Sequence, residues 1–202
     1  MKKISKYYYH IYSESPDLLS MAIAAGELAE NSWLCKECKY PKRNVGVVDV
    51  TLQESANEDE TVTGVAAFGV LVIKRSFLNT LGNTLLHEFF IGRVFVEDKG
   101  EDTDWATVRC KERFIVRGES NVAWRVCPEC GRNIYFAMGD RYLYPSPPLG
   151  CDIFESDLFG LILSEKVYSG INFEKWPELV VEQLPVLDTP RDGLPELIAS
   201  YM

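Results

Sequence analysis

Apolar and polar positions along most of the chain follow patterns that are typical of β-strands. Between residues 105 and 118 the apolar side chains recur at alternate positions and are interrupted at Glu112, which predicts a half-buried strand. Other stretches are rich in aromatic and β-branched residues, which favour extended structure. We expect strands over residues 6–12, 45–54, 84–97, 105–118 and 133–138.

Three stretches predict helices instead. In residues 15–30 the apolar side chains recur every three or four positions, Ser15 suits the N-cap, and Pro16 suits the first helical position. A buried strand within "VAAFGVLVIK" (65–74) is expected to lead into a short helix over residues 76–81. The segment "SEKVYSG" (164–170) predicts another short helix.

The order of these elements predicts an α+β fold. Strands and helices do not alternate as they do in a doubly wound sheet, so we expect mostly antiparallel strands with a few short helices. The polar segments 55–64 and 98–104 are expected to form a loop and a turn. The chain has 202 residues, of which 47% are hydrophobic, enough to bury a core without disulfides. We therefore treat residues 1–202 as a single domain.

Two CxxC pairs are the strongest chemical signal in the sequence. Cys35 and Cys38 lie in "CKEC", and Cys127 and Cys130 lie in "RVCPECGR". Four thiolates in two such pairs are the ligand set of a closed, tetrahedral, structural zinc site, so we predict a bound Zn²⁺. Free thiols and redox-active pairs are the alternatives, although neither pair opens a helix in a thioredoxin-like context.

The distance between the two pairs is unusual for a zinc site. In a compact zinc ribbon the pairs lie close together, whereas here 88 residues, 39 to 126, lie between them. The metal would join distant parts of the chain and close a long loop, which restricts the unfolded state. Of the remaining cysteines, Cys110 is expected to be a buried thiol, and Cys151 could lie near the metal although four sulfurs already complete its coordination.

The charge of the chain bears on its partners. With 30 acidic and 21 basic residues the net charge is −9, which disfavours direct contact with nucleic acid. It suits a basic protein partner, although solubility alone is a sufficient reason for it. The excess negative charge is concentrated in two polar segments. We predict that at least one of these segments rims a partner-binding surface, the alternative being solvated loops; the residues are Glu58, Asp59, Glu60, Glu101, Asp102 and Asp104.

Motifs for catalysis and for membrane insertion are absent from the sequence. It has no phosphate-binding loop or nucleophile elbow, and "HEFFI" lacks the second histidine of a metalloprotease motif. His10 and His87 are expected to be structural, and we predict that the protein is not an enzyme. No signal-peptide core and no 18-residue apolar run occur, so we expect a cytoplasmic protein with no membrane contact.

With the two cysteine pairs placed, the chain resembles the double-CxxCG motif family of immunity proteins from bacterial polymorphic toxin systems. The resemblance rests on the early CxxC, on "RVCPECGR", and on the tail "LGCDIFESDLFGLILSEKVYSGI". The sequence departs from the family pattern at Lys39, where a glycine is expected. The resemblance implies a single α+β domain that binds one cognate toxin and blocks it.

Three hypotheses for function follow. The first is an immunity protein that covers the active site or substrate path of a cognate toxin, and the negative charge favours a toxin with a basic nuclease domain. The second is a zinc-ribbon regulatory protein that contacts nucleic acid, which the charge disfavours. The third is a metalloenzyme, which needs an open coordination position and a base. An acidic face would favour the immunity protein, and a basic groove would favour the regulatory protein. A pocket beside the metal would favour the metalloenzyme.

Overall fold

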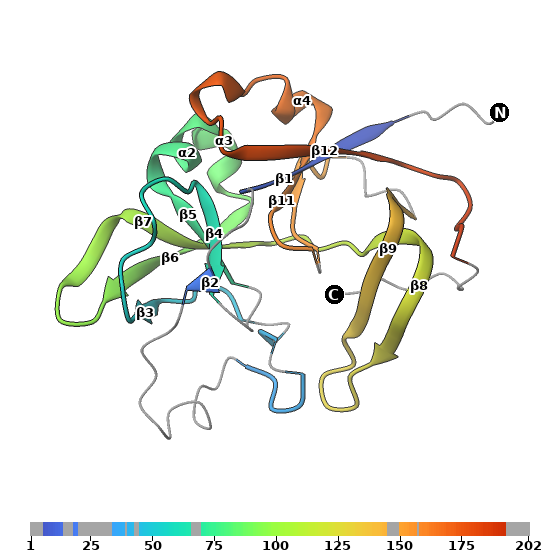
Figure 1. Ribbon diagram of the computed structural model, residues 1–202, viewed down its shortest axis with the longest axis horizontal. Coiled ribbons are helices and arrows are strands. Elements are labelled where there is room, and N and C mark those ends of the chain that lie inside the picture. The colour runs from blue at the N-terminus through green and yellow to red at the C-terminus, as the bar shows by residue number, and fades with distance from the viewer. Residues whose placement is uncertain are drawn as a thin grey trace.

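Three β-sheets and a few short helices make up the described part of the molecule (Figure 1). The computed structural model describes residues 6–13, 18–19, 34–38, 40–42, 45–65, 70–144, 150–156 and 158–192. These residues form a mostly-β structure, in which the longest helix has six residues. No helix in these ranges is both long enough and apolar enough to cross a membrane.

The largest sheet has six strands in the order β2-β4-β5-β7-β6-β3. The bounds in that order are Leu18–Leu19, Val62–Val65, Val70–Lys74, Gly100–Cys110, Phe89–Val96 and Val50–Leu52. The inner pairs are antiparallel, and the two short edge strands pair in parallel with β4 and β6.

Strand β5 explains why this sheet forms a stable core. Leu71 and Ile73 pack into one hydrophobic cluster, and Val70 and Val72 pack into another. Because successive side chains of a strand point to opposite faces, both faces of β5 are covered, which accounts for its uninterrupted apolar sequence.

A second sheet has four strands in the order β10-β11-β1-β12, all antiparallel. Its strands span Ile153–Phe154, Leu161–Ser164, Tyr7–Ser13 and Leu179–Pro185. Tyr8 and Phe154 pack edge to face, with ring centroids 5.3 Å apart, in the apolar cluster that covers one face. Strand β1 pairs with β12, so the first and last described strands are neighbours in space.

The third sheet is a long two-stranded hairpin, β8 (Val116–Val126) and β9 (Asn133–Leu143). Figure 1 shows it on the opposite side of the molecule from the turn between β6 and β7. An isolated two-stranded hairpin is marginal in water, so contacts with the rest of the protein must support this one.

The helices are short and lie close together in Figure 1. They are α2 (Arg75–Thr80), α3 (Asn83–Leu86), α4 (Glu165–Tyr168) and the 3₁₀-helix η1 (Phe173–Lys175). Helix α2 follows β5 directly and buries Phe77 and Leu78, as predicted for residues 76–81. Helix α4 begins at Ser164, whose Oγ accepts the N–H of Val167.

Several predicted strands have different bounds in the structure. The expected strand 84–97 is replaced at its start by α3, and β6 occupies Phe89–Val96. The expected turn 98–104 is shorter, because Glu101 and Asp102 already pair with β6 as the first part of β7. The expected strand 45–54 is reduced to β3, and the strand at 133–138 extends to Leu143.

Two further predictions change in a similar way. The expected strand 105–118 is broken between Cys110 and Val116, where Arg113 forms a parallel bridge with Glu155 instead. Within the predicted helix 15–30, Leu18–Leu19 is a strand paired with β4, and the other residues of that stretch lie outside the described residues.

Candidate metal centre

The first cysteine pair lies in a tight turn between β2 and β3, two edge strands of the six-stranded sheet. Leu34 and Pro41 form an antiparallel bridge across the turn, and the Cys35 N–H donates to the Tyr40 carbonyl at 2.9 Å. This bond closes the turn around Cys38. Lys39, where the sequence departs from the family pattern, lies outside the described residues.

The second pair lies in the turn that connects β8 to β9. The Cys127 N–H donates to the Arg132 carbonyl at 2.8 Å, and the Gly131 N–H donates to the Cys127 carbonyl at 2.9 Å. Gly131 has a φ of 69°, a conformation that glycine adopts without strain. In both turns the N–H of the first cysteine bonds the carbonyl five residues later, so the two pairs are presented by similar backbone geometry.

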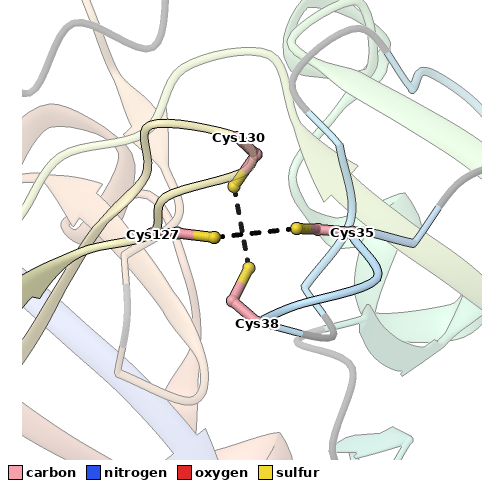
Figure 2. Close-up of side chains that lie close together, drawn as sticks. All are labelled: Cys35, Cys38, Cys127 and Cys130. Carbon is pink, nitrogen blue, oxygen red and sulfur yellow. Dashed lines mark hydrogen bonds between the residues drawn. The ribbon is translucent and has the colours of Figure 1, made fainter.

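The four sulfur atoms meet between the two turns (Figure 2), and all lie within 4.8 Å of one another. The Sγ atoms of Cys35 and Cys127 are 3.7 Å apart, and those of Cys38 and Cys130 are also 3.7 Å apart. A tetrahedral site with Zn–S bonds of about 2.3 Å has sulfur–sulfur edges of about 3.8 Å. These two distances match that spacing, and all six cysteines are free thiols.

The four thiols differ in burial and in local hydrogen bonding, and these differences change their pKa values. Cys35 and Cys127 are each 1% exposed, whereas Cys38 and Cys130 are partly exposed. Burial raises the pKa of Cys38 to about 12 and also raises the pKa of Cys130. Burial opposes ionisation of Cys127 too, but the backbone N–H groups of Cys130 and Glu129 outweigh it and lower the pKa to about 7. Metal binding requires thiolates, so these pKa values make metal affinity dependent on pH.

Other contacts hold the two turns together beside the sulfurs. Glu129 Oε2 accepts the backbone N–H of Glu37 at 2.9 Å across the interface. Arg132 donates from Nη2 to the Pro41 carbonyl at 2.7 Å, and its guanidinium lies 4.8 Å from the centre of the Tyr40 ring. Residues next to the cysteines therefore align the two turns as the outer shell of a metal site does.

The centre is also connected to the junction between the larger sheets. The Tyr40 ring lies 5.9 Å from the guanidinium of Arg113, which contacts the Glu155 carboxylate at 3.3 Å. Arg109, on β7, approaches the same carboxylate at 3.7 Å, and all three charged side chains are at most 8% exposed. Sequence reasoning missed Tyr40, Arg132 and this buried triad, because their pairing depends on tertiary contacts that no local pattern encodes.

The predicted acidic segments are only partly brought together. Glu58, Asp102 and Asp104 line one open cavity, although they come from two separate segments. Asp59 and Glu101 are exposed and lie outside the lining of that cavity. Glu60 is 7% exposed and closes a turn in which its N–H donates to the Asn57 carbonyl at 3.0 Å. Its side chain therefore cannot contribute to an exposed rim.

The remaining candidate residues lie away from the cysteine cluster. Cys110 is buried on β7, as expected, and Cys151 does not join the four clustered sulfurs. His10 is buried in β1, donates from Nε2 to the Phe159 carbonyl at 2.6 Å, and lies 3.3 Å from Glu182. His87 is exposed after α3 and contacts Glu88, so it is not in a strand.

Comparisons with known proteins add no family assignment. No protein-family model matches the chain, and no curated protein matches it.

Proposed function

We propose that the four cysteines bind one Zn²⁺ in a closed structural site. The observation that carries this proposal is the convergence of four Sγ atoms from two turns, with spacings of 3.7 Å that suit a tetrahedron. A tetrahedral set of four sulfurs selects zinc or iron among the common metals. Four protein ligands leave no coordination position for a substrate or water, which favours a structural role.

The metal acts as a clip between the early turn and the β8–β9 hairpin. It joins residues 92 positions apart and so closes a long loop of the chain. The test is metal analysis of protein purified without chelator. One zinc per chain is expected, with loss of zinc in Cys127→Ser and retention in Cys151→Ser, whose sulfur lies outside the cluster. Iron, or no metal, would contradict the proposal.

We further propose that this zinc-clipped α+β domain is an immunity protein that binds and neutralises a cognate bacterial toxin. The support comes from the resemblance carried by the cysteine motifs and the tail, and from the net charge of −9. A negative surface speeds encounter with a basic toxin domain, such as a nuclease, and rejects other partners. Inhibition would be stoichiometric, by covering the active site or the substrate path of the toxin.

The experiment uses the gene directly upstream. If its product contains a toxin domain, co-expression with this protein should restore growth of a bacterial host that the toxin alone arrests. The purified proteins should form a stoichiometric complex in which toxin activity is lost. A toxin that stays active in the presence of excess folded protein would contradict the proposal.

A control separates a structural clip from a direct contact. Cys127→Ser should reduce toxin binding only as far as it reduces the folded fraction, because the clip acts through stability. A variant that stays fully folded but loses binding would show that the metal centre itself contacts the toxin.

A further inference from the structure

An open cavity of about 480 Å³ lies at the side of the six-stranded sheet. Its lining comes from the loop after β3, the junction of β5 with α2, the start of β7, and the residue that follows η1. These strands and α2 lie away from the β8–β9 hairpin in Figure 1, so the cavity is distinct from the cysteine centre. Its volume is in the range of ligand pockets, roughly 300–1,000 Å³.

The charges of the lining are not paired with one another. Glu58, Asp102, Asp104, Lys74 and Arg75 all face the cavity, yet in the described part of the chain no ion pair within 4.0 Å joins any two of them. Both cations donate to backbone carbonyls. Lys74 donates to the carbonyl of Glu58, and Arg75 donates from Nε to the carbonyl of Trp105 at 3.1 Å.

The three carboxylates keep most of their capacity to accept hydrogen bonds. Asp102 Oδ1 accepts the backbone N–H of Asp104 at 3.2 Å, which is an exposed contact within the first part of β7. The oxygens of Glu58, Asp102 and Asp104 are too widely spread to share a metal ion, since only the four cysteines form such a group among the described residues. An extended organic cation fits this spread better than an inorganic one.

Aromatic rings complete the lining. Trp105 is 3% exposed, and Lys74 Nζ lies 5.6 Å from the centre of its ring, so this indole already holds a cation of the protein itself. The partly exposed Trp176 is the ring left open to a ligand. Trp176 lines the cavity as well and packs edge to face on Phe77, with centroids 5.3 Å apart. Indole rings attract cations, and a planar guanidinium can stack on them while its N–H groups bond carboxylates in pairs.

We propose that this cavity receives an arginine side chain of a protein partner. The guanidinium would pair with Asp102 and Asp104, with Glu58 as a further acceptor in the lining, and stack against the ring of Trp176. Three carboxylates against two cations leave the lining with a net negative charge, and the whole chain adds to that field. The proposal rests on the proposed function in one respect, the identity of the partner as a toxin. It adds the kind of residue, an arginine, that the acidic lining would recognise on that partner.

The first test uses N-acetyl-arginine methylamide as the probe, with the lysine and citrulline analogues for comparison. The chain has four tryptophans, so the indole N–H signal of Trp176 is assigned with Trp176→Phe and then followed by NMR. This signal should shift saturably as the arginine probe is added, and the arginine probe should bind about fivefold more tightly than the lysine analogue. The neutral citrulline analogue should give no saturable shift. No saturable arginine shift up to about 50 mM, or equal binding of all three probes, would overturn the proposal.

The second test uses charge-matched variants. Asp102→Asn with Asp104→Asn removes two carboxylates from the cavity, and Glu97→Gln with Asp98→Asn removes two from the adjacent turn outside it. The first pair should weaken binding of the arginine probe about fivefold or more, and the second pair less than about twofold. Equal weakening would show that only the general negative field attracts the probe, which would overturn a specific site.

The toxin complex gives an independent outcome. If the arginine probe binds as described but no toxin is neutralised, the cavity stands and the immunity function fails. The opposite outcome is a neutralised toxin that binds the Asp102→Asn, Asp104→Asn variant with unchanged affinity. The immunity function would then stand, and the cavity would not be the site that recognises the toxin.

Discussion

The six-stranded sheet and the β8–β9 hairpin depend on different interactions. Strand β5 buries apolar side chains on both faces, so the sheet carries its own hydrophobic core. The hairpin has two strands, and much of its attachment is polar: the buried Arg117–Asp192 ion pair, the Arg141–Glu182 contact, and the cysteine centre at its connecting turn. The comparison indicates that removal of metal or of an ion pair should affect the hairpin far more than the sheet.

The largest expected effect is the loss of the metal clip. With free zinc about 1,000-fold above its dissociation constant, binding to the folded state alone adds about 4 kcal/mol. Cys127→Ser should lose most of this free energy of unfolding, as measured by urea denaturation with zinc present. Cys151→Ser is the control, and it should keep the zinc-dependent part of the stability. Equal stability of Cys127→Ser and the parent protein in zinc would show that no clip exists.

The next largest effect concerns the ion pair that anchors the hairpin. The Arg117 and Asp192 side chains are both fully buried, and Arg117 Nε donates to Asp192 Oδ2 at 2.7 Å. The Tyr135 hydroxyl donates to the same carboxylate at 2.8 Å. Asp192→Ala removes the carboxylate that neutralises a buried guanidinium and should cost about 3 kcal/mol in zinc-loaded protein.

An exposed pair provides the control for that variant. Arg191 and Glu119 lie 2.7 Å apart, with side chains that are 48% and 46% exposed. Glu119→Gln should change the free energy of unfolding by less than about 1 kcal/mol. A cost for Asp192→Ala no greater than that of Glu119→Gln would remove the ion pair from the account of the hairpin.

A smaller effect tests the sheet. Ile73 is fully buried in β5, and Ile73→Val should lower the free energy of unfolding by about 1 kcal/mol through the lost methylene and the space it leaves. The cost should be the same with zinc and with chelator, because the side chain packs in a core that does not include the four clustered cysteines. A cost that disappears with chelator would mean that the sheet itself requires the metal.

The smallest expected effect depends on pH. Glu182, on β12, lies between His10 and Arg141, and these contacts hold its pKa below the usual 4.5. A depressed pKa stabilises the folded state above pH 4.5, and this contribution is lost as pH falls below that value. Glu182→Gln should cost a few tenths of a kcal/mol at pH 7 because the pair is partly exposed. The difference from the parent protein, taken at matched pH, should vanish in acid; a constant difference from pH 7 to pH 3 would contradict this.

Much of the cysteine centre could be predicted because its information is local. The CxxC spacing fixes each turn, and Gly131 supports the second one, so the four clustered cysteines were identifiable although 88 residues, 39 to 126, separate the pairs. Tyr40, Arg132 and Glu155 were not identifiable, because ordinary side chains acquire these roles only when distant segments meet.

The fold shows the same division between local and distant information. The apolar run of β5 and the capped start of α4 were predictable from their own residues. Helix α3 was missed because four apolar and polar residues cannot establish a period. The first residues of β7 were missed because Glu101 and Asp102 are polar, and their place in the sheet comes from pairing with β6.

Hydrogen exchange of the zinc-loaded and the chelated protein, resolved by peptide, tests most directly whether the metal holds the hairpin in place. Chelation should greatly reduce protection of the backbone amides in residues 116–143, while residues 70–74 and 105–110 of the six-stranded sheet remain protected. Unchanged protection of the hairpin after the metal has been removed, or uniform loss of protection over hairpin and sheet alike, would contradict this account.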